Sequence, residues 1–394
     1  MSSLEQVRIR NFRSLADVSL DLGSLNVLFG PNGAGKSSLL EAVWFMRDCA
    51  VRGVEEACSL RGRGVGLLFD GTEEGTAIAL EAVSDAQYSL ALGVSSGRID
   101  PLAGERLQSL KGDAQVLLER RIGSDNASFL FPGAREPKTV TLREPEKLSL
   151  ERYIAFEEAP PEAVNILRLL RGIRLYDSRS IDLAPLKQKG SGSSPEVGLW
   201  ADGANLWSVL RNLHDRKGRD ERYDVIMGYM RRSFPSFEDV LLEQTGPATV
   251  YASFIEHGRR NPILASGASN GHLQMLVLLT ALFSEATDGH SALLFDEPEV
   301  SLHPKALAVL GDALKSAASR PGKQVIVATH SPALLSQFDP QDVVAAEVHH
   351  GRTVLRRVTQ LEQVQDLVSE YSIGSLYMAG VIAPQEGASD TGAP

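Results

Sequence analysis

The chain has 394 residues, of which 43% are hydrophobic and 23% charged, with a net charge of −10 and a pI near 5.4. This length suffices for a large α/β core with an inserted subdomain, while the acidic balance offers no general attraction for nucleic acid. The two cysteines, Cys49 and Cys58, exclude a disulfide framework and a zinc site, and no apolar run is long enough to span a bilayer. We therefore expect a cytoplasmic protein without a membrane partner.

The first part of the chain has the pattern of strands. The stretches "EQVRIRNF" and "ADVSLDLG" alternate apolar and polar residues, and the apolar run "LNVLF" leads directly into a glycine-rich loop. From Ser37 onward apolar residues recur at helical spacing, so the predicted order is strand, loop, helix. From about Gly64 to Glu144, the stretches "TAIALEAV", "YSLALGV" and "TVTLRE" predict an antiparallel β region.

The middle of the chain has a helical pattern between Pro161 and Phe234. Pro161 suits a first helical turn, and the leucines and valine of "LWSVLRNL" recur at helical spacing. After Glu238 strands resume. The pattern predicts the N-terminal half of a core with its antiparallel region in 1–150, a helical insert in 151–237, the C-terminal half of the core in 238–384 and a disordered tail in 385–394.

The segment "GPNGAGKS", Gly30 to Ser37, is a complete G-x-x-x-x-G-K-[ST] motif. Its glycines let successive backbone N–H groups point at phosphates, and the start of the following helix adds its positive end. Lys36 would reach the β and γ phosphates, and Ser37 would ligate Mg²⁺. The loop residues that we assign to nucleotide binding are Gly30, Asn32, Gly33, Ala34, Gly35, Lys36, Ser37 and Ser38.

A second motif is "ALLFDEPE", an apolar strand that ends in two carboxylates. A carboxylate in this position lies at the C-terminal edge of a strand, where α/β sheets bind ligands. Asp296 would hold Mg²⁺ through water. We expect Pro298 to keep Glu297 in extended geometry, aimed at the water that attacks the γ-phosphate.

Two further segments follow the same logic. The apolar strand "KQVIVAT" runs into His330, which at this edge can donate a hydrogen bond to the γ-phosphate. Ser269 precedes the apolar helix "NGHLQMLVLLTAL" and is a good N-cap, so the start of this helix is a second anion site.

Taken in order, "VRIRNFRSL", "GPNGAGKSSLLEA", "SNGHLQML", "LLFDEPEVSLHP" and "VIVATHSP" resemble the ABC-type ATPases of the RecF, SMC and OLD (overcoming lysogenization defect) group. The chain is most similar to stand-alone bacterial ATPases related to OLD, over nearly its whole length. The resemblance implies an α/β fold, a P-loop NTPase of ABC-ATPase type with a mixed sheet core, an antiparallel β region and an inserted helical lid.

The resemblance also implies ATP and Mg²⁺ as cofactors and a head-to-tail homodimer, with a higher oligomer left open. Each ATP would lie between the phosphate loop of one subunit and the signature helix, "SNGHLQ", of the other. By this resemblance Ser269 and Gly271 contact the partner's ATP, and Arg13 lies near the nucleotide. The signature lacks the LSGGQ of transporters, Gln274 replaces a basic residue common in relatives, and for the Q-loop there remain two candidates, Gln87 and Gln115.

OLD nucleases continue after the His motif into a Toprim nuclease domain, whereas the segment after His330 here is short and has no D-x-D pair. We therefore expect an ATPase that works with a separately encoded effector, a nuclease, in antiviral defence. The alternative is a RecF-like ATP-dependent DNA-binding protein in DNA repair, for which net charge gives no support. Small basic clusters occur at Arg231/Arg232, Arg259/Arg260 and Arg356/Arg357, and the first two would favour this alternative if the fold brings them to one surface. A transporter subunit fits the long insert poorly, and a module that binds ATP without turnover has no need of Glu297.

Overall fold

The core of the molecule is a mixed β-sheet of six strands. The computed structural model describes residues 3–62, 65–69, 77–95, 98–112, 114–285, 291–361, 364, 367 and 371–382. Within these residues, the strands of the core sheet run in the order β11-β16-β17-β3-β18-β19, and all are parallel to their neighbours except β19, which is antiparallel to β18. The strands are β3 (Leu25–Phe29), β11 (Ile173–Asp177), β16 (Ser291–Asp296), β17 (Lys323–Thr329), β18 (Val343–His349) and β19 (Arg352–Arg357).

The central strands of this sheet are buried on both faces. Every residue of β3 and of β17 is buried, which is typical of parallel strands covered on both sides. Along β17, Val325 and Val327 pack on one face of the sheet, while Ile326 and Ala328 pack on the other. This continuous burial explains why the short apolar runs of the sequence form strands.

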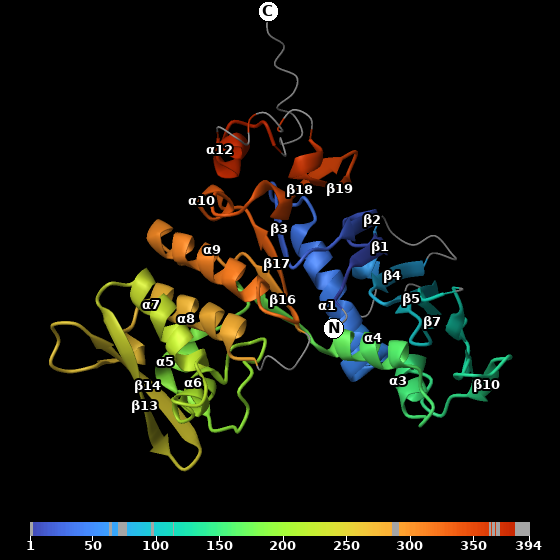
Figure 1. Cartoon of the computed structure of the whole chain (residues 1–394), viewed down its shortest axis with the longest axis horizontal. Coiled ribbons are helices and arrows are strands. Elements are labelled where there is room, and N and C mark those ends of the chain that lie inside the picture. Colours follow the sequence, from blue (N-terminus) through green and yellow to red (C-terminus); the bar gives the residue numbers. More distant parts are fainter. Residues whose placement is uncertain are drawn as a thin grey trace, which may run out of the picture.

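Helices cover both faces of the core sheet. On one face lie α8 (Asn270–Phe283) and α9 (Pro304–Ala318), with α6 (Leu206–His214) and α7 (Arg222–Ser233) behind them. On the other face lies α1 (Lys36–Arg52), which Figure 1 shows between the core strands and the N-terminal strands. Smaller helices complete the packing: α2 (Val54–Ser59), α3 (Ser149–Ile154), α4 (Pro161–Arg171), α5 (Leu183–Gln188), α10 (Pro332–Leu335) and α12 (Ile373–Met378).

A second, antiparallel sheet lies beyond α1 and has the order β10-β9-β8-β7-β5-β4-β1-β2, with β6 paired to β5. The predicted antiparallel region from about 64 to 144 is therefore confirmed, and the first two strands of the chain join it. The strands are β1 (Gln6–Phe12), β2 (Leu15–Asp21), β4 (Ala77–Val83), β5 (Ala86–Ser95), β6 (Arg98–Ile99), β7 (Gly104–Ser109), β8 (Val116–Arg120), β9 (Asn126–Phe129) and β10 (Lys138–Thr141).

The middle segment is less helical than its sequence pattern indicates. Within the stretch predicted to be helical, Ile173–Asp177 forms β11 and pairs in parallel with β16 of the core sheet. The helices that follow pack with a small sheet of β12 (Ser191–Gly192), β13 (Phe237–Gly246), β14 (Thr249–Glu256) and β15 (Ile263–Leu264). The predicted tail, 385–394, lies outside the described residues. None of the described helices is long and apolar enough to cross a membrane.

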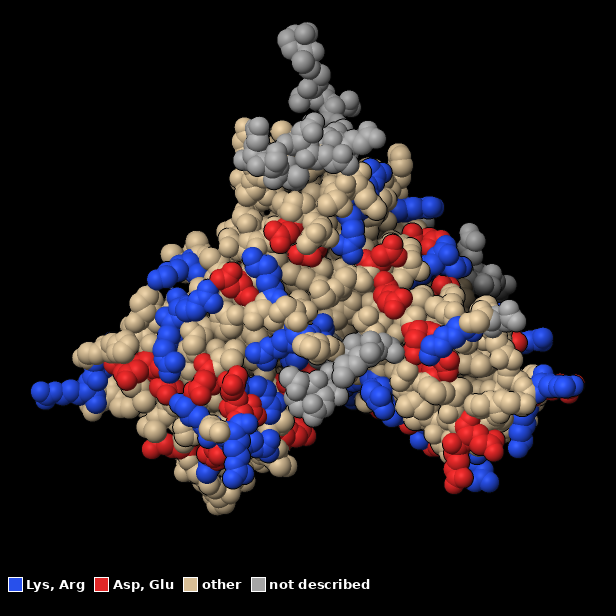
Figure 2. All heavy atoms as spheres, in the orientation of Figure 1, with Lys and Arg blue, Asp and Glu red and all other residues tan. Residues whose placement is uncertain are grey.

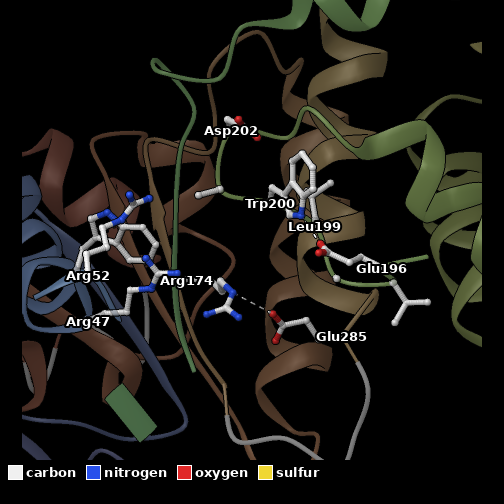
Figure 3. Close-up of a pocket in the computed structure, with 12 residues that line it drawn as sticks. Arg47, Arg52, Arg174, Glu196, Leu199, Trp200, Asp202 and Glu285 are labelled. Atoms are coloured by element: carbon white, nitrogen blue, oxygen red, sulfur yellow. Dashed lines mark hydrogen bonds and ion pairs between the residues drawn. The ribbon is translucent and has the colours of Figure 1, made fainter. Parts of the chain in front are cut away.

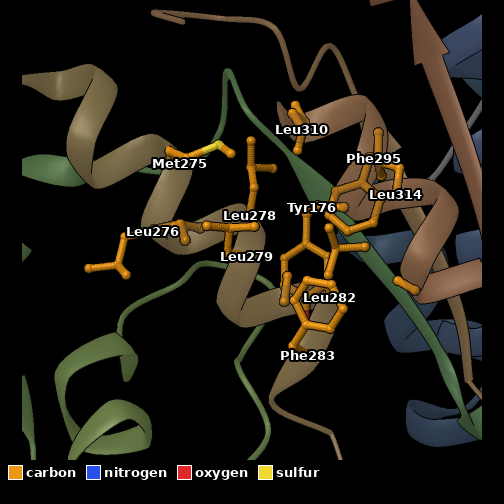
Figure 4. Close-up of a cluster of buried hydrophobic side chains, with 14 of the residues drawn as sticks. Tyr176, Met275, Leu276, Leu278, Leu279, Leu282, Phe283, Phe295, Leu310 and Leu314 are labelled. Atoms are coloured by element: carbon orange, nitrogen blue, oxygen red, sulfur yellow. The ribbon is translucent and has the colours of Figure 1, made fainter. Parts of the chain in front are cut away.

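Helix α8 is the centre of the hydrophobic core on its side of the sheet. Figure 4 shows its apolar side chains packed against Tyr176 of β11, Phe295 of β16 and the leucines of α9. Leu278 is fully buried in this cluster, and every residue from Leu273 to Phe283 is buried. The helix that bears the signature residues is thus fixed firmly to the sheet.

We predict that Leu278→Ala lowers the free energy of unfolding by about 2–5 kcal/mol, because it leaves a cavity in a packed core. The matched control is Leu264→Ala, at a leucine whose side chain is exposed by 57%; it should change stability by less than about 0.5 kcal/mol. Chemical denaturation followed by circular dichroism measures both, and equal losses would show that α8 is not the packing centre.

Candidate active site

The phosphate loop, Gly30–Ser37, joins β3 to α1 as predicted. Its glycines are sterically required. A Cβ on Gly30 would lie 2.1 Å from the carbonyl oxygen of Ala346, and one on Gly35 would lie 2.2 Å from Oγ1 of Thr353. Gly33 and Gly35 also have positive φ angles of 80° and 89°. Strands β18 and β19 therefore lie so close to Gly30 and Gly35 that a larger residue does not fit at either position.

Lys36 begins α1 and is largely buried under the loop. Its Nζ donates hydrogen bonds to the carbonyl oxygens of Gly30 at 2.8 Å and Pro31 at 2.9 Å. Burial lowers the pKa of Lys36, and the carboxylates of Asp296 and Glu297 oppose that shift. The ammonium group thus lies in the loop where phosphate oxygens would be bound. Asn32 and Ser37 are exposed nearby, and Ala34 is buried.

Asp296 is the last residue of β16 and lies next to the start of α1. Burial raises the pKa of its carboxyl group to about 6, and a hydrogen bond with Ser37 opposes the rise. Asp177 ends the neighbouring strand β11 directly opposite Asp296. Among the described residues the Oδ1 atom of Asp296 is buried without a hydrogen-bond partner. A hydroxyl and a carboxylate oxygen are the ligands that Mg²⁺ prefers, so this pair fits the predicted metal.

Glu297 follows directly and has a strained backbone. Its φ is +48°, in the left-handed region, so the expectation that Pro298 keeps it extended is wrong. The backbone N–H of Glu297 donates to the carbonyl oxygen of Ala328 in β17 at 2.9 Å, which holds the residue against the sheet edge. Such a conformation costs about 1–3 kcal/mol and occurs most often at functional sites. Its side chain is 9% exposed.

The carboxylate of Glu297 lies beside an arginine and a histidine. It forms an ion pair with Arg179, and its Oε1 lies 3.6 Å from Nδ1 of His330. His330 follows the last residue of β17, as predicted, and its side chain is partly exposed. The structure therefore brings the predicted Glu297 and His330 together.

Glu299 is a functional candidate that the sequence argument missed. Its Oε1 accepts hydrogen bonds from Oγ1 of Thr329 at 2.7 Å and from the backbone N–H of His330 at 3.0 Å. The same oxygen lies 3.4 Å from Nδ1 of His330. The signal was present in the second glutamate of "DEPE". Glu299 connects the loop after β16 to the loop after β17.

Arg13 lies in the turn between β1 and β2, with a φ of +49°, and its guanidinium lies over the ring of Phe12 at 5.7 Å from the centroid. The following residue, Ser14, donates to Oγ of Ser38 in the first turn of α1 at 3.1 Å. Oγ1 of Thr353 donates to Oγ of Ser14 at 3.2 Å. The turn that carries Arg13 is therefore attached to the first turn of α1, which begins within the phosphate loop.

The signature residues lie at the start of α8. Oγ of Ser269 accepts a hydrogen bond from the backbone N–H of His272 at 3.2 Å, which confirms the predicted N-cap. A Cβ on Gly271 would lie 2.7 Å from the carbonyl oxygen of Ser301, so the helix start packs closely on the segment after β16. These residues therefore lie beside the Asp296–Glu299 loop of their own chain.

Gln274 connects the same helix to the end of β11. It is buried, and its Nε2 donates to Oγ of Ser178 at 2.8 Å. The backbone N–H of Ser178 donates in turn to the carbonyl oxygen of Asp296 at 3.1 Å. Of the two Q-loop candidates, Gln87 lies in β5, where it donates to Glu81, and Gln115 precedes β8 in the antiparallel sheet.

A separate cavity of about 530 Å³ lies between α1, β11 and the loop at 196–202. Figure 3 shows Arg47, Arg52 and Arg174 on one side of it and Glu196 and Glu285 on the other, with an ion pair of 3.6 Å between Arg174 and Glu285. Among the described residues that line this cavity there are none of the predicted site residues. Its charges are largely balanced within its own wall.

Comparison with known proteins agrees with this geometry. An OLD nuclease from Thermus scotoductus is 22% identical over 333 residues, which are 84% of this chain and 59% of the relative. The Old nuclease of Escherichia phage P2 is 21% identical over 94% of this chain and 63% of its own length. The DNA replication and repair protein RecF of Colwellia psychrerythraea is 29% identical over 136 residues, 34% of each chain. The chain thus spans less than two thirds of these relatives.

Solved structures show the same fold. An Smc head bound to the C-winged helix domain of ScpA matches with a TM-score of 0.50 and 14% identity, covering 92% of this chain and 99% of that one. An Smc head with an extended coiled coil, bound to the C-terminal domain of ScpA from Pyrococcus furiosus, matches with a TM-score of 0.52 and 12% identity, over 94% and 100%.

The family whose model matches is described as "AAA domain, putative AbiEii toxin, Type IV TA system", and the match extends over residues 25–336. The phosphate loop, the signature residues, the Asp296–Glu297 pair and His330 all lie within that range. The chain belongs to this AAA family and has the P-loop ABC-type ATPase fold of the OLD, RecF and SMC group.

Proposed function

We propose that the protein hydrolyses ATP and dimerises around two ATP molecules. The observation that supports this best is that Lys36, Glu297 and His330 meet at one edge of the core sheet, the carboxyl edge, where the parallel strands β3, β16 and β17 end. In α/β sheets this edge is the usual place for ligands. The cluster offers a cation for phosphate and a carboxylate for the attacking water, as phosphoryl transfer needs.

Each residue has a distinct proposed task. Lys36 exchanges the carbonyl oxygens of its own loop for the β and γ phosphates, and the backbone N–H groups of the loop bind the remaining oxygens. Ser37 and Asp296 hold Mg²⁺, which neutralises phosphate charge. Glu297 orients water and His330 contacts the γ-phosphate. Arg13 adds positive charge beside the first turn of α1.

The dimer proposal concerns the start of α8. The capped N-terminus of this helix offers free backbone N–H groups and the positive end of its dipole, which favour an anion. Asn32 and Ser37 of the phosphate loop and Ser269 are all exposed, so a second copy has access to both sides of the site. We therefore propose that Ser269 and Gly271 of one subunit bind the γ-phosphate held by the other.

We further propose that this ATP cycle serves a separately encoded effector, a nuclease, in antiviral defence. Two relatives are named OLD nucleases, but the chain matches only 59% and 63% of their lengths, so their cleavage activity is not assigned to it. Two structural neighbours are Smc heads bound to ScpA domains, which illustrates how such a head can hold a partner protein.

The second candidate, a RecF-like DNA-binding protein, rests on the partial likeness to RecF. Three of the four arginines in its predicted basic pairs have partners within the chain. Arg231 donates to the carbonyl oxygen of Glu238, Arg232 pairs with Asp312, and Arg259 pairs with Glu256. On the face shown in Figure 2, Lys and Arg side chains are interspersed with Asp and Glu rather than gathered in one patch. These contacts disfavour extensive DNA binding.

We predict that Glu297→Gln lowers the turnover number for ATP by about 10²- to 10⁴-fold, since it removes the base that orients water, while ATP affinity is retained. The same change should trap the ATP-bound dimer. Steady-state phosphate release and light scattering measure the two effects. The control is Glu285→Gln, at a carboxylate paired with Arg174 away from the site. Undiminished turnover in Glu297→Gln would reject this role.

We predict that Ser269→Asp weakens ATP-dependent dimerisation but leaves ATP binding by the single subunit intact. Aspartate still caps the helix, yet its charge repels the partner's γ-phosphate and should weaken the dimer at least about tenfold. Ser269→Asn is the matched control, because it caps equally well without charge. Size-exclusion chromatography with light scattering, in the presence of ATP, measures dimerisation of both variants. Equal dimerisation of Ser269→Asp and Ser269→Asn would contradict the proposed contact with the partner's γ-phosphate.

We predict that duplex DNA leaves the ATPase rate unchanged and that the purified chain does not cleave DNA. The reason is the acidic net charge together with the internal pairing of the basic clusters. Phosphate release with and without duplex DNA, using Glu297→Gln as the blank, tests this. Strong, salt-sensitive stimulation by DNA would favour the RecF-like function instead.

A further inference from the structure

Arg179 is a cation at the carboxyl edge that none of the sequence motifs includes. It lies two residues after the end of β11, the strand next to β16, where Asp177 and Asp296 are paired neighbours. Its guanidinium forms an ion pair with the carboxylate of Glu297. The residue proposed to orient the attacking water is thus paired with an arginine from the turn that follows β11.

The backbone around Arg179 is fixed, whereas its side chain is free to move. The N–H of Arg179 donates to Oδ1 of Asp177 at 2.9 Å, and Ser178 is hydrogen-bonded to Asp296 and Gln274. The side chain of Arg179 is nevertheless 62% exposed, in contrast to 9% for Glu297. The arginine can therefore leave the pair at little cost in burial, while the buried glutamate cannot follow it.

The charge of Arg179 also acts on Lys36 of the phosphate loop. Burial is the main cause that lowers the pKa of Lys36, three carboxylates including Glu297 oppose it, and the charge of Arg179 makes the smallest contribution to the lowering. The charge of Glu297 thus acts on two cations, Lys36 of the loop and Arg179 of the turn after β11. A guanidinium matches phosphate oxygens with two parallel donors and binds them more strongly than a neutral group does.

We propose that Arg179 is a γ-phosphate contact that exchanges partners on ATP binding. Without a terminal phosphate it stays on Glu297; when ATP is bound, the guanidinium moves to the γ-phosphate and frees the Glu297 carboxylate to orient water. The exchange makes the water-orienting group available only when the phosphate to be attacked is in place. This inference rests on the proposed ATPase function and adds a residue that distinguishes ATP from ADP.

The test compares affinities for a non-hydrolysable ATP analogue and for ADP, both with Mg²⁺, by isothermal titration calorimetry. Arg179→Ala should weaken binding of the analogue about tenfold, the usual effect of losing a charged hydrogen bond, and leave ADP affinity unchanged. Arg179→Lys should restore part of the loss, because it keeps the charge without the planar fork. Arg174→Ala, in β11 itself but paired with Glu285, should change neither affinity.

Two outcomes would overturn the proposal: equal weakening of both nucleotides by Arg179→Ala, which would show a general electrostatic effect, or no weakening of either. Thermal unfolding of Arg179→Ala shows whether the variant remains folded at the temperature of the titration. Failure of the underlying function is distinguishable, because the unaltered chain would then bind neither nucleotide, and that result would reject both proposals.

Discussion

Burial of several carboxylates at one edge of a parallel sheet is the constraint on which the rest of the site depends. Burial raises the pKa of the Asp296 carboxyl group to about 6, and the side chains of Glu297 and Glu299 are 9% and 8% exposed. Uncompensated negative charges in such a place are costly, so cations and donors must face them. Lys36 and His330 come from different strand ends to do so, which makes the carboxyl edge the one place where all these elements must meet.

The sequence predicted the elements of this edge well where pattern and motif coincide. Asp296 ends β16, His330 follows β17, and Lys36 starts α1. The strands could be predicted because short apolar runs are typical of parallel strands that are buried on both faces. The strand β11 was missed, since its five residues, "IRLYD", lie directly after a helix and have no periodicity of their own. Pairing with β16 in the finished sheet, rather than local preference, makes this segment a strand.

The contacts between residues distant in the chain could not be predicted. Gln274 and Ser178 are separated by 96 positions and meet only because α8 packs beside the end of β11. The same holds for Arg179 and Glu297. The left-handed backbone of Glu297 opposes the local rule for a residue before proline, which shows that hydrogen bonding to Ala328 outweighs the intrinsic preference. Local rules fail at functional sites because packing there enforces strained geometry.

These distant contacts also bear on how two subunits would communicate. The two Q-loop candidates, Gln87 and Gln115, lie in or beside the antiparallel sheet. Helix α8 has contacts of its own with the carboxyl edge, since Gly271 packs on Ser301 in the segment after β16, and Gln274 bonds to Ser178, whose N–H donates to Asp296. Under the proposed dimerisation, a phosphate bound at the start of α8 would act on a helix that is rigidly joined to the catalytic edge of its own chain. Each subunit could then sense the partner's ATP through α8 itself.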